Sequence, residues 1–119
     1  MKLLAHLVLF IALMAICTTG RATSSLSFAG QGYWLDLEIG HTDHPVVASI
    51  TFHKPGDLKG VVLRDNFLMK FFDARSKRLV LDYKGSDPRV GPFTLIVHGE
   101  RATLETAGTH INSDFSWFL

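Results

Sequence analysis

Apolar and polar residues alternate along most of the chain from residue 33 onwards. In the segment 33–39, Trp34, Asp36 and Glu38 alternate with four apolar residues, and the segments 46–53 and 93–98 keep the same period. A period of two indicates strands, because successive side chains of a strand point to opposite faces. No segment has a helical period, so we predict an all-β chain.

Turn-forming residues separate the alternating segments. Pro55, Gly56 and Asp57 follow the segment 46–53, and a long loop at 84–92 contains two glycines and two prolines. Proline presets a turn and glycine accepts positive φ. We therefore predict a single antiparallel β-sandwich or small barrel of seven or eight short strands. These strands are expected at 33–39, 46–53, 61–63, 67–72, 78–83, 93–98, 102–106 and 115–119.

The first two dozen residues have the order of a secretory signal. Lys2 precedes an apolar run at 7–17, and small and polar residues follow at 18–24. The run is too short to span a bilayer, which needs about 20 residues. We predict a cleaved signal peptide at 1–22, a single domain at 23–119, a periplasmic or secreted location and no stable membrane anchor.

Removal of residues 1–22 changes the composition of the domain. Ten basic and eleven acidic residues remain, so the net charge is about −1, which disfavours a nucleic-acid partner. The only cysteine, Cys17, is lost, and a disulfide framework is excluded. Small domains secreted into oxidising surroundings often carry disulfides. The chain also lacks an Asn-x-Ser/Thr acceptor, and together these absences favour a bacterial periplasmic protein.

Basic residues are locally enriched between Lys70 and Arg89. Six of them outnumber three aspartates in that segment. We interpret the segment as the solvated end of a hairpin, and recognition of an anionic molecule stays open as the alternative.

No motif for catalysis is found. The chain has no Gly-x-Ser-x-Gly elbow, no glycine-rich phosphate loop and no His-Glu-x-x-His sequence. We therefore predict a protein that is not an enzyme and needs no cofactor. His41 and His44, with Asp43 between them, offer ligands that zinc or copper accepts. Completing such a site needs His53, His98 or His110, and we favour plain surface histidines over a metal site.

Large apolar residues fall on faces of the predicted strands that should meet water. A two-layer sandwich buries one face of each sheet, so these residues need another cover: a loop, a different register or a partner. The outward apolar residues are Trp34, Val47, Leu68, Phe72, Val80, Ile96 and Phe118. Aromatic residues are enriched at interface hot spots. The predicted partner-binding residues are Trp34, Asp36, Glu38, Leu68, Phe72 and Phe118.

These features favour a small exported binding protein. The profile is typical of inhibitors and immunity proteins, which neutralise a hydrolase or toxin by covering its active site. The expected partner is such a protein, or a second copy of the chain in a homodimer. Two alternatives remain: a ligand or metal carrier that uses the turn from His41 to His44, and an assembly subunit that pairs through a sheet edge.

The first testable prediction concerns processing. The exported protein should begin near Thr23 or Ser25, because small residues follow the apolar run there. Amino-terminal sequencing or intact mass measures the start directly. A membrane-bound mature protein that keeps residues 1–22 would contradict the predicted location.

Overall fold

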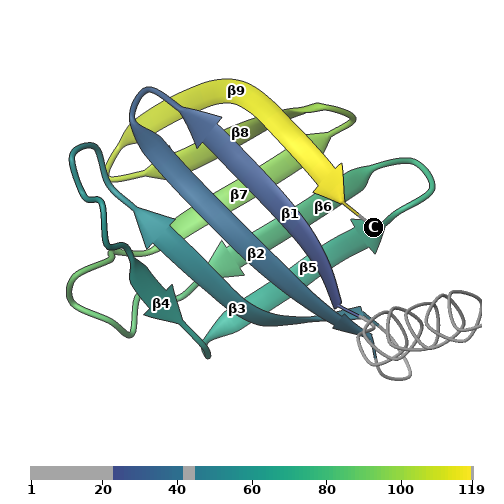
Figure 1. Ribbon diagram of the computed structural model, residues 1–119, viewed down its shortest axis with the longest axis horizontal. Coiled ribbons are helices and arrows are strands. Elements are labelled where there is room, and N and C mark those ends of the chain that lie inside the picture. The colour runs from purple at the N-terminus through teal and green to yellow at the C-terminus, as the bar shows by residue number, and fades with distance from the viewer. Residues whose placement is uncertain (1–22, 42–44, 119) are drawn as a thin grey trace, which may run out of the picture.

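A computed structural model describes residues 23–41 and 45–118 of the chain (Figure 1). Within these residues the secondary structure is β-strand, and no helix is present. The strands are β1 (Thr23–Gly30), β2 (Tyr33–His41), β3 (Pro45–His53), β4 (Val61–Leu63), β5 (Phe67–Asp73), β6 (Arg78–Tyr83), β7 (Phe93–His98), β8 (Arg101–Thr106) and β9 (Thr109–Phe118).

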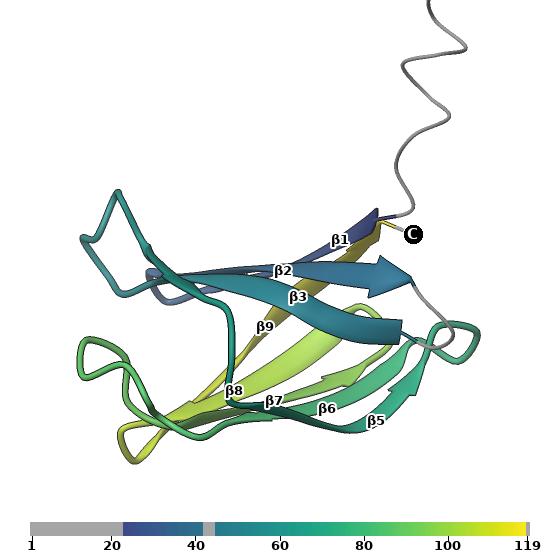
Figure 2. The same cartoon turned by 90° about the horizontal axis from the view of Figure 1, so that it is seen from below.

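The nine strands form one continuous antiparallel sheet in the order β4-β3-β2-β1-β9-β8-β7-β6-β5. The sheet curls into a half-barrel, so that β1, β2 and β3 face β6, β7 and β8 across the interior (Figure 2). The predicted all-β class is confirmed. The strands belong to one sheet, and the two separate sheets of a sandwich are not found within the described residues. The strand that sequence analysis missed is β1.

The concave face of the sheet holds the apolar core. Alternation places Leu26 and Phe28 of β1 inward, and both are fully buried. Phe52 of β3 packs on Phe93 of β7 with ring centroids 5.1 Å apart, which joins the two walls of the half-barrel. The other fully buried large side chains are Leu35, Leu37, Ile39, Ile50, Leu79, Leu81, Leu95, Leu104 and Ile111.

The pairing of β1 distinguishes the two predicted starts of the exported protein. Thr23 pairs with Gly40 and Ser24 pairs with Ile39. A chain that starts at Thr23 keeps both pairs, whereas a start at Ser25 removes them and leaves part of β2 without that neighbour. Of the two predicted starts, the one at Thr23 therefore preserves the whole of β1.

A β-bulge in β3 moves the side chains before it to the opposite face of the sheet. Glu38 pairs with Ser49 and Ile39 pairs with Val47, so Ala48 is an extra residue on β3. Val47 consequently packs against the core. The outward position expected for Val47 is wrong, because strict alternation does not hold across a bulge.

A second bulge in β5 has the same effect. Met69 pairs with Leu81 and Phe71 pairs with Val80, which leaves Lys70 as the extra residue. Phe71 therefore lies outward, and Phe72 turns inward against Trp117 with ring centroids 6.1 Å apart. The outward position expected for Phe72 is wrong, and its neighbour Phe71 occupies that face.

The two ends of the curled sheet approach each other at β3 and β5 without forming a ladder. The β5 edge is interrupted by the bulge at Lys70, whose Nζ lies 2.9 Å from Oδ2 of Asp82. Bulges and lysines at sheet edges hinder pairing with another strand. The edge of β5 is thus protected although it is open.

The bulge in β5 predicts that two adjacent substitutions destabilise the fold by unequal amounts. Phe72→Ala should lower the free energy of unfolding by about 2 kcal/mol or more, because it removes a ring packed against the core. Phe71→Ala should cost less than about 1 kcal/mol, because Phe71 is exposed. Urea denaturation of both variants measures the difference, and the reverse order would contradict the bulge.

Candidate binding surface

Four of the six predicted partner-binding residues lie on one outer face of the sheet. Trp34, Asp36 and Glu38 are outward residues of β2, and Phe118 is an outward residue of β9. Figure 1 shows β1 between these two strands. Leu68 is exposed on β5, away from this face, and Phe72 is turned inward. Four of the six predicted residues therefore share one surface, Leu68 is exposed as expected but lies apart from it, and only the outward position of Phe72 is wrong.

Small residues of β1 form the floor between β2 and β9. Across the sheet, Ser25 lies between Glu38 and Phe118. The next outward position, Ser27, lies between Asp36 and Ser116, and Ala29 lies between Trp34 and Asp114. The floor side chains are short, whereas Trp34, Asp36 and Glu38 of β2 and Asp114 and Phe118 of β9 are longer. We call this surface the β1 trough and its β2 and β9 sides the two rims; it is defined by the nine residues Ser25, Ser27, Ala29, Trp34, Asp36, Glu38, Asp114, Ser116 and Phe118.

The dimensions of the β1 trough follow from sheet geometry. Adjacent strands lie about 4.8 Å apart, so its two rims are separated by about 10 Å. Four residues along β2 separate Trp34 from Glu38, which corresponds to about 13 Å. Trp34 and Phe118 stand at opposite corners and are 46% and 66% exposed. These rings give an incoming surface two apolar contacts across a polar floor.

The ring of Trp34 is held in place by His53 of β3. The two rings stack with centroids 4.7 Å apart and an interplanar angle of 18°. His53 is itself only 7% exposed, and its Nδ1 donates a hydrogen bond to the carbonyl oxygen of Asp57 at 2.9 Å. One face of the indole is therefore supported by a fixed ring, while the other parts of Trp34 remain open to solvent.

The charge of the β1 trough is acidic. Within the described residues, Asp36 and Glu38 form no salt bridge, and Glu38 accepts a hydrogen bond from the Ser49 hydroxyl at 3.3 Å. Asp114 on the opposite rim lies 2.8 Å from Nη1 of Arg101. An acidic surface with exposed aromatic rings complements a basic partner.

A second exposed apolar surface lies on β5, β6 and β7. Phe71, Val80 and Ile96 are neighbours across the outer face, and the guanidinium of Arg78 lies 5.7 Å from the centroid of the Phe71 ring. Beside it, a groove of about 660 Å³ follows the open seam between β3 and β5. The sequence did not reveal Phe71 or the seam, because both depend on the bulge and on the curl of the sheet.

Two of the histidines considered for the metal alternative, His41 and His53, lie far apart in the fold. His41 pairs with Pro45 and His53 pairs with Trp34, so His41 and His53 occupy opposite ends of the β2–β3 ladder, about 23 Å apart along β2. His110 lies 3.4 Å from Glu105. His44 lies outside the described residues. Among the residues that are described, no group of three or more His, Cys, Asp or Glu side chains is placed to hold a metal ion.

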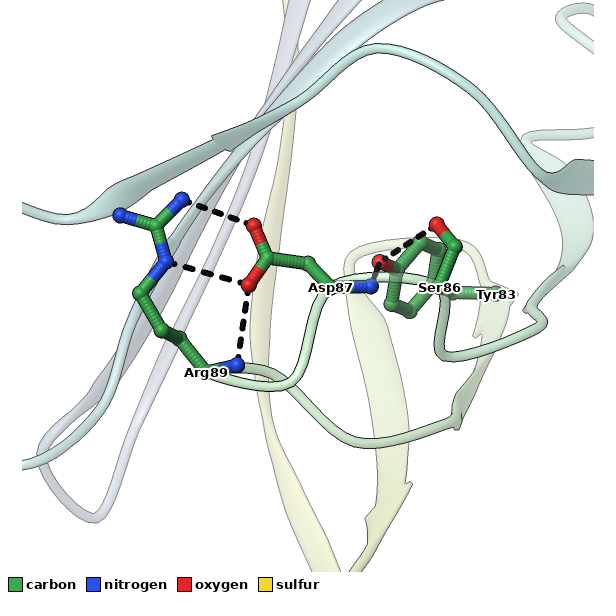
Figure 3. Close-up of polar contacts among 4 residues, drawn as sticks. All are labelled: Tyr83, Ser86, Asp87 and Arg89. Carbon is green, nitrogen blue, oxygen red and sulfur yellow. Dashed lines mark hydrogen bonds and ion pairs between the residues drawn. The ribbon is translucent and has the colours of Figure 1, made fainter.

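The loop between β6 and β7 is ordered by a chain of polar contacts (Figure 3). The hydroxyl of Tyr83 accepts a hydrogen bond from the backbone N–H of Asp87 at 2.7 Å and contacts the Ser86 hydroxyl at 3.2 Å. The carboxylate of Asp87 accepts hydrogen bonds from Nε, Nη2 and the backbone N–H of Arg89. These bonds lower the pKa of Asp87 to about 2.

No helix within the described part of the chain has the length and apolar character needed to cross a membrane.

Comparison of the chain with protein-family models, curated proteins and solved structures found no match.

The Asp87–Arg89 contact predicts a pH dependence of the β6–β7 loop. The pKa of Asp87 is lowered from 3.8 by its hydrogen bonds to Arg89, so the contact is fully present above pH 3.8 and is lost as the pH falls through about 2. The carboxyl carbon of Asp87, followed by NMR, should titrate near pH 2. In Arg89→Gln its midpoint should rise towards 3.8, and an unchanged midpoint would show that Arg89 does not hold the carboxylate.

Proposed function

We propose that this chain is an exported, non-enzymatic binding protein that uses the β1 trough to bind a basic surface of another protein. The observation that carries this proposal is the pair of exposed rings, Trp34 and Phe118, on either side of a floor of small residues. Asp36 and Glu38 add two carboxylates that form no salt bridge within the described residues. Aromatic anchors within a polar surround are typical of interface hot spots. The class we propose is an inhibitor or immunity-type protein that covers the active site of a periplasmic hydrolase or toxin.

Preorganisation supports a role for Trp34 in binding. A flexible side chain loses rotamer freedom on association, at a cost of about 0.5–1.5 kcal/mol. Because the ring of Trp34 already stacks on the buried ring of His53, part of this loss is incurred during folding. The exposed part of the indole is then available for a partner, and a fully buried Trp contributes about 150–250 Å² of area.

The carboxylates support a basic partner. Asp36 and Glu38 stand beside Trp34 on β2 and are separated from the basic β5–β6 hairpin by the curl of the sheet. Charges at the rim of an interface mainly raise the association rate, and salt screens them. Asp36→Asn with Glu38→Gln should consequently slow association more than it speeds dissociation.

A sheet-edge assembly is the second candidate, and the open edge of β5 favours it. That edge is seven residues long and carries exposed Leu68 and Phe71. The bulge at Lys70 opposes it, because an irregular, charged edge pairs poorly. The carrier alternative depends on His41 and His44, and stoichiometric zinc or copper in protein purified without an affinity tag would promote it.

The test of the proposed function begins with a pull-down from a periplasmic extract and continues with Trp34→Ala. This variant should weaken binding of the captured partner by at least about 2 kcal/mol, with a smaller loss of folding stability. Calorimetry measures the affinity and thermal unfolding measures the stability. Ile96→Ala is the matched control, because it removes an exposed apolar side chain from β7, outside the trough.

Three outcomes would contradict the proposal. One is a wild-type protein that forms no complex with another protein although Trp34→Ala unfolds, which would make Trp34 a purely structural residue. Another is a loss of affinity in Ile96→Ala equal to that in Trp34→Ala. The third is self-association through β5 with no other partner, which would favour assembly instead.

A further inference from the structure

A pocket lies at the end of the half-barrel where the β3–β4 loop faces the β6–β7 loop. Figure 2 shows the two loops one above the other at the same end of the sheet. The pocket has a volume of about 310 Å³. Its apolar floor consists of two core residues, Phe52 and Val90, and of Val61. Lys54, Lys59, Arg89 and one acid, Asp57, also line it. Three cations and one carboxylate therefore surround an apolar floor.

The carboxylate of Asp57 forms its hydrogen bonds within the β3–β4 loop. One carboxylate oxygen of Asp57 accepts hydrogen bonds from the backbone N–H groups of Lys59 and Gly60, both at 3.1 Å. Its backbone carbonyl accepts the bond from His53. In the described part of the chain, neither Lys54 nor Lys59 forms a salt bridge. Both ammonium groups remain available to a ligand.

The cation of the β6–β7 loop is oriented by its neighbour. Asp87 accepts hydrogen bonds from Nε of Arg89 at 3.1 Å and from Nη2 at 2.8 Å (Figure 3). A guanidinium carries five N–H donors, so Nη1 and one N–H of Nη2 are left for another acceptor. The bidentate contact fixes the plane of the guanidinium before any ligand arrives, which lowers the entropy lost on binding.

We propose that this pocket binds a phosphoryl group attached to a small apolar moiety, such as a phosphate monoester or a phospholipid headgroup. The three cations outnumber Asp57, the acid that lines the pocket and accepts hydrogen bonds from the backbone of its own loop, and arginine and lysine both favour phosphate oxygens. The volume is at the lower end of small-molecule sites, which limits the organic part to a few heavy atoms. The floor of Phe52, Val61 and Val90 receives that part.

A residue at the tip of the β3–β4 loop is expected to contribute to binding of a lipid headgroup but not of a soluble phosphate ester. Leu58 follows Asp57 directly and is 94% exposed, beside Lys59. An exposed leucine next to lysines suits contact with an anionic lipid surface. A soluble phosphate ester needs the three cations and the floor, and it makes no use of Leu58.

The experiment measures binding of phenyl phosphate and of inorganic phosphate to the purified protein at constant ionic strength. The amide NMR signals of Gly60 and Val90 should shift saturably. Phenyl phosphate should bind at least about threefold more tightly than inorganic phosphate, because its ring covers the apolar floor. The double substitution Lys54→Gln, Lys59→Gln should weaken phenyl phosphate binding at least about tenfold.

Arg75→Gln with Lys77→Gln is the matched control. It removes the same charge from the β5–β6 turn, at the other end of the sheet (Figure 1), and should change the affinity less than twofold. An equal loss in the control, or no saturable shift at Gly60 and Val90, would overturn the proposal. Because the two lysines make no described salt bridge, their substitution should leave the fold intact, and thermal unfolding checks this.

Binding to lipid vesicles distinguishes a lipid headgroup from a soluble phosphate ester. Phosphatidylglycerol vesicles, compared with phosphatidylcholine vesicles, report contact with an anionic headgroup. Binding that phenyl phosphate displaces and that Leu58→Ser weakens supports a lipid headgroup. Retained phenyl phosphate binding without vesicle binding supports a soluble phosphate ester. Vesicle binding that survives the double lysine substitution would overturn the pocket as the site of recognition.

Discussion

The pairing of β1 with both β2 and β9 is the constraint on which the rest of the structure depends. The chain forms two meanders, β1 to β4 and β5 to β9, and β1 joins them into one sheet. Leu26 and Phe28 fill the concave side of that strand, while Ser25, Ser27 and Ala29 on its outward side are small. The same strand therefore anchors the core on one face and creates the floor of the trough on the other.

The strand class could be predicted because alternation is strong in most segments, and the positions of Trp34, Asp36 and Glu38 followed from it. β1 was missed although Leu26 and Phe28 also alternate with small polar residues, because the segment adjoins the predicted cleavage region. Val47 and Phe72 were placed on the wrong face for a different reason. A bulge shifts the register by one residue, and no sequence pattern here distinguishes a bulged strand from a regular one.

The trough could be predicted only in part, since its two rims come from opposite ends of the chain. The aromatic and acidic residues of β2 were identified from their outward positions, and Phe118 was grouped with them without knowledge that β1 separates them. The support of Trp34 by His53 was not foreseen, because it requires the β2–β3 register. The pocket between the two loops depends equally on the curl of the sheet, which brings Lys59 and Arg89 together from segments far apart in sequence.

The β1–β9 pairing also sets when the fold can be completed. Ser25 pairs with Phe118, so β1 cannot complete its pairing in the sheet until β9 is present. Contacts between distant parts of a chain form late, because the loop entropy must be overcome first. A chain that crosses a membrane through a narrow channel must do so unfolded, and here the sheet cannot close until β9 has followed the other strands across. The strand order itself thus delays closure of the sheet until β9 has been synthesised, which suits the export that we propose.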